Sequence, residues 1–435
     1  MTSTLITGIS ELWTLDPALD DPARPGGVAE QQVRRDAALV IEDGRIAWTG
    51  PAAQAPSADA SEDLGGRAVL PGWVDSHSHL IFDGDRAAEF EARMAGRGYR
   101  AGGIGVTTDA TRAASPQRLA ALVRARIAEA VAGGTTTLET KTGYGLTLEH
   151  ELEAARLISE LVEARELDEG TFLGAHLVPG EFADRAEEYV DLVAGEMLAA
   201  VAPHVRWIDV FCEEGAFDTA QSERVLRAGA EAGLGLRVHG NQLGHSGGVE
   251  LAVALGAASV DHVNHLAPAA LEALAATASR PTAAGDAPGW LAVDAGPTVA
   301  TVLPACDLST RAPLAPARDL LDAGAQLAIA SNCNPGTSYT SAMSFCVATA
   351  VLQMHLSLGE AIRAATRGGA LALRRSDVGH LAVGARADLH VLEAPAAIHL
   401  AYRPGMPLTH RVLRAGVPQL TAPMAHPLQA GRASG

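Results

Sequence analysis

The stretch Ala68-Val-Leu-Pro-Gly-Trp-Val-Asp-Ser-His-Ser-His79 marks the point at which the pattern of the chain changes. After it, apolar strands alternate with stretches that carry apolar residues at helical spacing. Strands are predicted at 68–74, 134–139, 171–177, 205–212, 234–239, 258–262, 297–303 and 326–331. Helices are predicted between most of them, at 116–132, 148–165, 183–202, 219–232 and 315–323. This rhythm predicts an α/β protein with a (β/α)8 barrel of the TIM type.

The two ends of the chain are β-rich instead. Residues 37–41 and 45–48 are apolar runs on either side of the turn Glu42-Asp-Gly44, which predicts a hairpin. Residues 379–392 are strand-like again, after helices predicted at about 338–354 and 358–373. We expect both ends to form one small β-sandwich. The predicted domains are residues 1–68 (N-terminal part of the sandwich), 69–375 (barrel) and 376–435 (C-terminal part of the sandwich and tail).

The charge balance excludes two classes of partner. The 435 residues include 33 Lys and Arg against 51 Asp and Glu, a formal net charge of −18. Nucleic acid and acidic membrane surfaces both require a positive surface, so neither is expected as a partner. The oligomeric state is left open, with a homodimer as one candidate.

Cysteine usage and the N-terminal segment bear on the compartment. Cys212, Cys306, Cys333 and Cys346 are scattered without a CxxC pair, so neither a disulfide framework nor a thiolate zinc site is predicted. The N-terminus lacks a basic segment followed by a long apolar run, and no apolar stretch reaches membrane-spanning length. A cytoplasmic protein is therefore expected. Lys141 is the only lysine, which we attribute to coding bias.

Histidines follow several predicted barrel strands at the carboxyl end, where such barrels place their chemistry. His77 and His79 are two residues apart, so alternation along an extended segment puts both imidazoles on one side. His239 and His262 end the fifth and sixth strands. Neutral imidazoles from the first and fifth strands, with a carboxylate from the eighth, would make a site for zinc or iron that leaves a position open for water. The eighth strand is followed by Asn332.

The chain resembles the amidohydrolase superfamily and, within it, the imidazolonepropionase family. The resemblance covers about residues 70 to 420. Its motifs are Pro71-Gly-Trp-Val-Asp-Ser-His-Ser-His79, Asp83-Gly-Asp-Arg86-Ala-Ala-Glu-Phe90, Gly102-Gly-Ile104, Glu139-Thr-Lys-Thr-Gly-Tyr144-Gly-Leu146, Ala175-His-Leu-Val-Pro179, Phe211-Cys-Glu-Glu-Gly-Ala-Phe217 and Asn334-Pro-Gly-Thr337. The Thr-Gly-Tyr-Gly-Leu and Asn-Pro-Gly-Thr motifs separate this family from other amidohydrolases.

The resemblance implies hydrolysis of the cyclic amide 4-imidazolone-5-propanoate, a small molecule, to N-formimidoyl-L-glutamate in histidine degradation. It implies one divalent or trivalent metal per chain, zinc or iron, at His77, His79, His239 and Asn332, where the family has Asp. The implied catalytic residues are Asn332, His262 and Gln242. The implied substrate-binding residues are Arg86 (for the propanoate), Tyr99, Tyr144, His176, Gln242, Asn334, Gly336 and Thr337.

Several alternatives stay open. Because Asn332 replaces the expected carboxylate, the chain could be a scaffold with crippled catalysis that binds ligands; it could also be an amidohydrolase for another nitrogen heterocycle. His265 competes with His262 for the catalytic role, and His262 is favoured because it directly ends the strand. Glu213 or Glu214 could bridge a second metal, whereas Lys141 follows the wrong strand to act as a carboxylated metal-bridging lysine.

Overall fold

The computed structural model describes residues 3–21, 26–96, 103–280 and 296–420. Within these residues, eight parallel strands form a barrel whose order follows the chain. They are β5 (Trp73–Asp75), β6 (Thr135–Lys141), β7 (Glu169–Ala175), β8 (Trp207–Cys212), β9 (Gly235–Gly240), β10 (Ser259–His262), β11 (Val299–Val302) and β12 (Leu327–Ile329). A bridge between Ser78 and Cys333 joins the segments that follow β5 and β12, the first and last strands. The predicted (β/α)8 barrel is confirmed.

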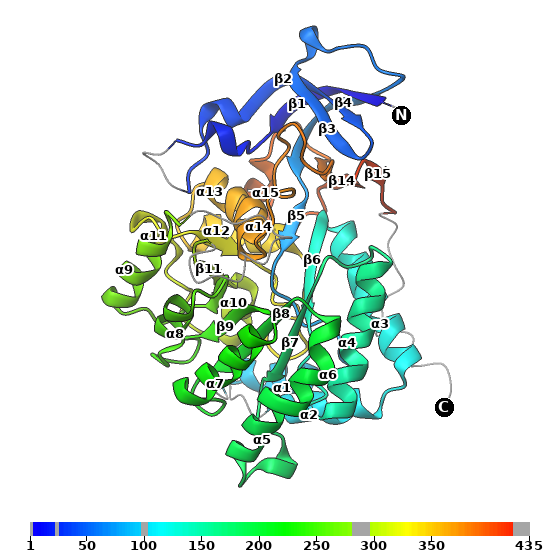
Figure 1. The fold of residues 1–435 in the computed structure, drawn as a ribbon. Helices are drawn as coiled ribbons and strands as arrows, with labels where there is room; N and C mark the ends of the chain where they lie inside the picture. The colour runs from blue at the N-terminus through cyan, green and yellow to red at the C-terminus, as the bar shows by residue number, and fades with distance from the viewer. Residues whose placement is uncertain (1–2, 22–25, 97–102, 281–295, 421–435) are drawn as a thin grey trace.

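Helices cover the outside of the barrel (Figure 1). Those between barrel strands are α1 (Ala87–Met94), α2 (Ile104–Ala113), α3 (Pro116–Ala132), α4 (Leu148–Glu163), α5 (Ala186–Leu192), α6 (Leu198–Val201), α7 (Thr219–Glu231), α8 (Gly248–Leu255), α9 (Pro268–Thr277), α10 (Pro304–Thr310) and α11 (Ala317–Asp322). After the barrel come α12 (Met343–Gln353), α13 (Leu358–Arg363), α14 (Gly369–Ala372) and α15 (His399–Tyr402). Short π-helical segments join α5 to α6 and α13 to α14, so the helices predicted at 183–202 and 358–373 are nearly continuous.

Local capping residues explain where the longer helices begin. The side chain of Ser115 accepts a hydrogen bond from the backbone N–H of Arg118, and Pro116 occupies the first turn of α3. Asp218 and Gln221 form a reciprocal capping box at the start of α7. These side chains satisfy N–H groups that have no partner inside the helix, which fixes where each helix starts behind its strand.

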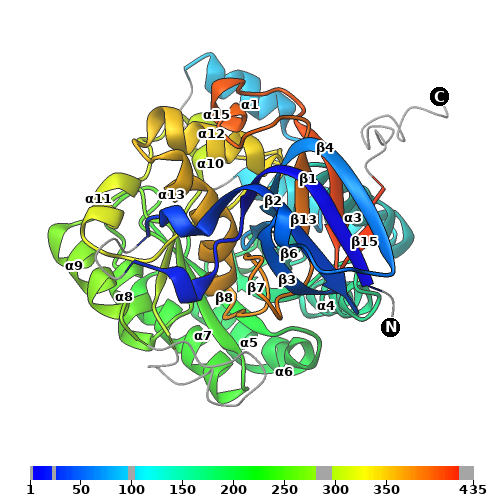
Figure 2. The same ribbon diagram turned by 90° about the horizontal axis from the view of Figure 1, so that it is seen from above.

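The two ends of the chain come together, as predicted, and the structure shows them as one mixed sheet. In the described part of the chain its order is β15-β14-β13-β4-β1-β2-β3. The bounds are β1 (Ser3–Trp13), β2 (Val33–Glu42), β3 (Arg45–Pro51), β4 (Ala60–Pro71), β13 (Leu389–Leu392), β14 (Thr409–Arg414) and β15 (Val417–Pro418). β4 is the centre, because it pairs in parallel with β1 and antiparallel with β13 (Figure 2). The predicted hairpin corresponds to β2 and β3.

The single strand predicted at 68–74 is divided between the two sheets. β4 ends at Pro71 in the mixed sheet, and β5 begins at Trp73 in the barrel. Gly72 lies between them, where an added Cβ would meet Oγ1 of Thr136 at 2.1 Å. The chain can therefore pass from one sheet to the other only because this residue has no side chain. The predicted domain boundaries stay a prediction.

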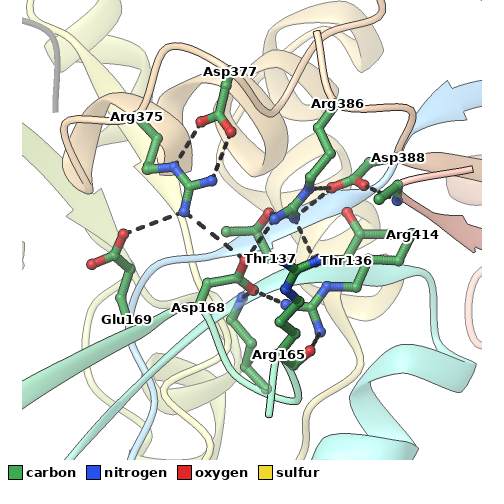
Figure 3. A network of polar contacts seen from close by, with 12 residues as sticks. Thr136, Thr137, Arg165, Asp168, Glu169, Arg375, Asp377, Arg386, Asp388 and Arg414 are labelled. Carbon is green, nitrogen blue, oxygen red and sulfur yellow. Dashed lines mark hydrogen bonds and ion pairs between the residues drawn. The ribbon is translucent and has the colours of Figure 1, made fainter. Parts of the chain in front are cut away.

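A buried carboxylate ties the mixed sheet to the barrel (Figure 3). Asp168, directly before β7, contacts Arg386 and Arg414 at 2.8 Å each. Burial opposes the charge of Asp168, but the two guanidinium groups outweigh it and lower its pKa. Asp168 lies at the amino ends of the barrel strands, so the mixed sheet leaves their carboxyl ends open. Figure 1 shows the sheet at the top and α1 and α2 at the opposite end.

The core is built mainly from Ala, Leu and Val, with buried Trp73 and Trp207 among its largest side chains. Among the described helices, none combines the length and apolar character needed to cross a membrane.

Candidate active site

Histidines from three strands meet at the carboxyl end of the barrel. His77 and His79 follow β5, His239 lies near the end of β9 and His262 ends β10. The Nε2 atom of His79 lies 3.2 Å from Nε2 of His77 and 3.3 Å from Nε2 of His239. Ring nitrogens converging at this distance either share protons or face a common cation.

Buried carboxylates set the orientation of two of these rings. Oδ2 of Asp261 lies 2.7 Å from Nδ1 of His77, and Oδ2 of Asp209 lies 3.1 Å from Nδ1 of His239. A carboxylate at Nδ1 keeps the proton there and turns the lone pair of Nε2 toward the centre, which is the usual arrangement behind a metal-binding histidine.

The electrostatics also favour neutral rings. Burial, with the nearby charge of Lys141, lowers the pKa of His77 well below its usual range. Burial and the neighbouring imidazole of His77 do the same for the pKa of His79. Metal ions bind the neutral form of imidazole.

The described residues contain groups that can hold a metal ion. The ligand atoms of His77, His239 and His262 lie within 4.8 Å of one another, as do those of His77, Asp209 and Asp261. Nδ1 of His79 is buried and makes no hydrogen bond to the described residues. The donor set, neutral imidazoles backed by carboxylates, fits a zinc or iron ion.

Asn332 lies beside these histidines. It follows β12, is 2% exposed, and its backbone N–H donates to the carbonyl of His77 at 2.9 Å. Its φ of 50° places it in the left-handed region, which Asn and Asp tolerate better than other residues with a Cβ. Its side chain hydrogen-bonds to the thiol of Cys306, whose pKa burial raises to about 12. The backbone here suits either Asn or Asp.

One cavity collects most of the residues predicted for the site. Its wall is formed by His79, Arg86, Ile104, Tyr144, His176, Phe211, His239, Gln242, His262, Asn332, Asn334 and Thr337. His262 lies on this wall, whereas His265 packs against His245 outside it, with ring centroids 6.1 Å apart. Tyr99 lies outside the described residues.

Arg86 is held at the wall by a neighbouring carboxylate. Its side chain is 3% exposed, and its guanidinium donates through Nε and Nη2 to Glu89, at 2.7 Å each. Gly336 lies against the other edge, where an added Cβ would be 2.2 Å from Nη1 of Arg86. Glu89 therefore occupies the edge of the Arg86 guanidinium formed by Nε and Nη2. Nη1 lies on the other side of the guanidinium, next to Gly336.

The Gly336→Ala variant is expected to lower kcat/KM about tenfold to a hundredfold, because the methyl group must displace the Arg86 guanidinium. The effect should fall mainly on KM, measured by steady-state kinetics. Gly195→Ala is the matched control, because an added Cβ there meets no atom within 4 Å. Equal kinetics for both variants would contradict a binding role for Arg86.

The loop that carries Tyr144 is anchored from α4. Oε1 of Glu151 accepts hydrogen bonds from the backbone N–H groups of Gly143, Gly145 and Leu146, at 2.8–3.2 Å. The ring of Tyr144 packs beside His176, with centroids 5.3 Å apart. These contacts place Tyr144 on the cavity wall.

His176 presents its Nε2 atom to the cavity. Its Nδ1 lies 2.8 Å from the carbonyl of Gly143, and burial lowers its pKa to about 4. A neutral ring that donates through Nδ1 has an acceptor at Nε2.

Two polar side chains, one on the wall and one next to it, also hold the backbone of this region. Asn334 accepts from the N–H groups of Gly336 and Thr337 through Oδ1, at 2.9 and 2.8 Å. Its Nδ2 donates to the carbonyl of Asn332 at 2.7 Å. Asn334 therefore builds the turn itself. Oε2 of Glu213 accepts from the N–H of Gln242 at 2.7 Å, which holds the loop after β9.

The sequence predictions missed four residues that organise the site: Asp209, Asp261, Glu89 and Phe211. A carboxylate inside a predicted apolar strand is a signal that could have identified Asp209 and Asp261. Glu89 lies three residues after Arg86, the spacing of neighbours on a helix.

Known proteins resemble this chain along most of its length. Residues 68–418 match the Amidohydrolase family. The imidazolonepropionase of Micrococcus luteus is 65% identical over 420 residues, which cover 96% of this chain and 99% of that protein. The imidazolonepropionase of Saccharopolyspora erythraea is 62% identical over 421 residues, covering 96% of this chain and 99% of the relative.

Solved structures agree on the fold. A triazine hydrolase variant superposes with a TM-score of 0.68 at 19% identity, covering 96% of this chain and 94% of that one. An adenosine deaminase from Xanthomonas campestris with bound zinc gives 0.67 at 19% identity, covering 96% and 92%. The family match and the high identity to these imidazolonepropionases over nearly the full length show that the chain belongs to the amidohydrolase family and, within it, to the imidazolonepropionases.

Proposed function

We propose that this chain hydrolyses the ring amide of 4-imidazolone-5-propanoate to N-formimidoyl-L-glutamate, a step of histidine degradation. The observation that carries the proposal is a single cavity whose wall combines convergent imidazoles with a buried arginine, Arg86. Imidazoles suit a metal-assisted hydrolysis, and a guanidinium suits a carboxylate tail. The family to which the chain belongs supports the same reaction.

We assign one metal ion, zinc or iron, to His77, His79, His239 and Asn332. The distances between the Nε2 atoms and the carboxylates behind two of the rings support this assignment. When bound, the ion supplies Lewis-acid polarisation of the ring carbonyl and lowers the pKa of a water molecule.

The remaining wall residues hold and orient the substrate. Arg86 binds the propanoate through Nη1 and through the second N–H of Nη2, while Glu89 keeps the guanidinium in place. His176 accepts a hydrogen bond at Nε2, and Tyr144 packs against the ring of the substrate. Gln242 and His262 lie near the ring carbonyl. Burial, with the neighbouring His239, lowers the pKa of His262 to about 3, so its ring is neutral and can donate one hydrogen bond.

A second candidate is a scaffold with crippled catalysis that binds ligand, and Asn332 is the observation that favours it. An amide carries no charge and does not act as a base at neutral pH. The two candidates share a cavity and differ in turnover. The homodimer stays a prediction.

The test measures turnover of imidazolone propanoate, with the product identified by mass spectrometry, beside a panel of purine, pyrimidine and triazine rings. We expect formimidoylglutamate as the only product, and loss of both activity and metal in His239→Ala. The control is His410→Ala, because His410 lies on the mixed sheet and pairs with Glu393. Turnover of another ring in preference to imidazolone propanoate would refute the proposal.

A further inference from the structure

Lys141 lies at the centre of a buried charge cluster under the histidines. It ends β6 and is fully buried, with Nζ 2.9 Å from Oε1 of Glu139 and 3.0 Å from Oδ2 of Asp209. Both carboxylates are also fully buried. Without this ammonium group, two carboxylates inside the barrel would lose their cation.

Each carboxylate leads to a different strand of the histidine site. Asp209 contacts Nδ1 of His239, which belongs to β9. Oε2 of Glu139 accepts from the backbone N–H of Ser78 at 3.1 Å, and Ser78 stands between His77 and His79. The backbone N–H of Lys141 also donates to the carbonyl of Ser78 at 3.2 Å. One cation thus connects the histidines that follow β5 with the histidine of β9.

The chain uses arginine for every fixed positive side chain except this one. An ammonium group has three donors at a single point, whereas a guanidinium has five in a plane. Arg237, buried in the same barrel, shows what a guanidinium needs. It donates to the carbonyls of Ser76 and Ala372 at 2.7 and 3.0 Å, besides its contact with Asp261 at 3.4 Å. Nζ of Lys141, by contrast, contacts one oxygen of Glu139 and one of Asp209. Two oxygens around a single nitrogen suit the compact charge of an ammonium group better than a planar guanidinium.

Arg237 and Lys141 therefore stand in equivalent places. Arg237 contacts Asp261, which orients His77, and Lys141 contacts Asp209, which orients His239. Each of these rings is backed by a carboxylate that is in turn backed by a buried cation.

We propose that Lys141 is a positioning residue that holds the metal-binding histidines of β5 and β9 in register through Glu139 and Asp209. Its ammonium group fixes both carboxylates, and these fix the Ser78 backbone and the His239 ring. The proposal rests on the metal site assigned above. Residues behind the ligands of a metal typically change its affinity about 10- to 100-fold.

The first test variant is Lys141→Met/Glu139→Gln, which removes one positive and one negative charge together. The second is Lys141→Arg, which keeps the charge and changes its shape. The matched control is Arg375→Met, because Arg375 belongs to a charge cluster at the opposite end of the barrel (Figure 3). Zn²⁺ affinity is measured by chelator competition on the full chain, both as it stands and with Asn332→Asp. Thermal unfolding of the metal-free proteins reports stability.

We expect the zinc dissociation constant to rise about 10- to 100-fold in both Lys141 variants and to change less than about twofold in Arg375→Met, even where that control unfolds earlier. The visible spectrum of the Co²⁺ form should shift in Lys141→Arg, since it reports ligand geometry. If the double variant does not unfold cooperatively, Lys141→Arg decides alone.

Affinities and Co²⁺ spectra equal to those of the parent would overturn the inference, as would an equal loss in Arg375→Met. If neither the parent nor its Asn332→Asp form binds Zn²⁺, the assigned metal site fails and the inference falls with it. Parent binding that is abolished by His239→Ala, together with unchanged Lys141 variants, would refute this inference alone.

Discussion

Asn332→Asp is expected to raise the turnover of imidazolone propanoate by at least about a hundredfold, because general acid–base catalysis typically contributes about 10²–10⁴ in rate. An aspartate at this place would accept a proton from the attacking water and deliver it to the leaving ring nitrogen. It would also add a negative charge beside imidazoles that carry none. Metal content, measured by elemental analysis, should rise from below one ion per chain to one.

The structure around Asn332 can accept an aspartate without rearrangement of the backbone. Asn and Asp are nearly isosteric, and both tolerate the φ of 50° at this position. The backbone N–H of Asn332 bonds to the carbonyl of His77, and this contact does not depend on the side chain. Fold and cavity should therefore survive the substitution, which thermal unfolding of the metal-free proteins checks.

Asn332→Ala is the control that separates charge from size, and it should not restore turnover. An Asn332→Asp protein with unchanged rate and a full complement of metal would show that the proton shuttle lies elsewhere. His262 would then be the next residue to test, because it lies on the same cavity wall.

The barrel could be predicted because its strands are apolar runs separated by helical spacing, and each predicted strand overlaps an observed one. The cavity could be anticipated for a related reason: parallel strands bring their carboxyl ends together, so His77, His239 and Asn332 had to approach one another. The spacing of apolar residues does not show where a strand ends in one sheet and continues in another, because that depends on packing against residues far away in the sequence. The change of sheet at Gly72 depends on the contact with Thr136, 64 residues along the chain.

The parts of the site that were not foreseen are buried charges with partners from distant strands. Lys141, Asp209 and Asp261 lie in or at the ends of apolar strands, and their pairing depends on how barrel strands face one another. For Asn334, the sequence identified the residue but not its structural role. The motif indicated a substrate contact, and the structure shows that its amide also builds the turn around Gly336 and Thr337.

Arg86→Ala is expected to lower kcat/KM for imidazolone propanoate by roughly 30- to 900-fold, which corresponds to about 2–4 kcal/mol for a charged contact whose partner is left unpaired. The loss has two causes. The propanoate loses its cation, and the Glu89 carboxylate, which Arg86 neutralises at 2.7 Å, is left near the tail of the substrate. Arg86→Lys should recover only part of the loss, since an ammonium group cannot serve Glu89 and the propanoate with the same fork of donors.

The double variant Arg86→Ala/Glu89→Gln separates these two causes. Because Gln carries no charge, it should regain part of the kcat/KM lost in Arg86→Ala, whereas Glu89→Gln alone should loosen the guanidinium and weaken binding. The measurements belong in the Asn332→Asp background, where turnover is expected to be high. Arg118→Ala is the matched control, because Arg118 also pairs with a nearby carboxylate, Asp83, but stands outside the cavity wall. If Arg86→Ala and Arg118→Ala show the same kcat/KM as the parent, the propanoate is bound by another residue.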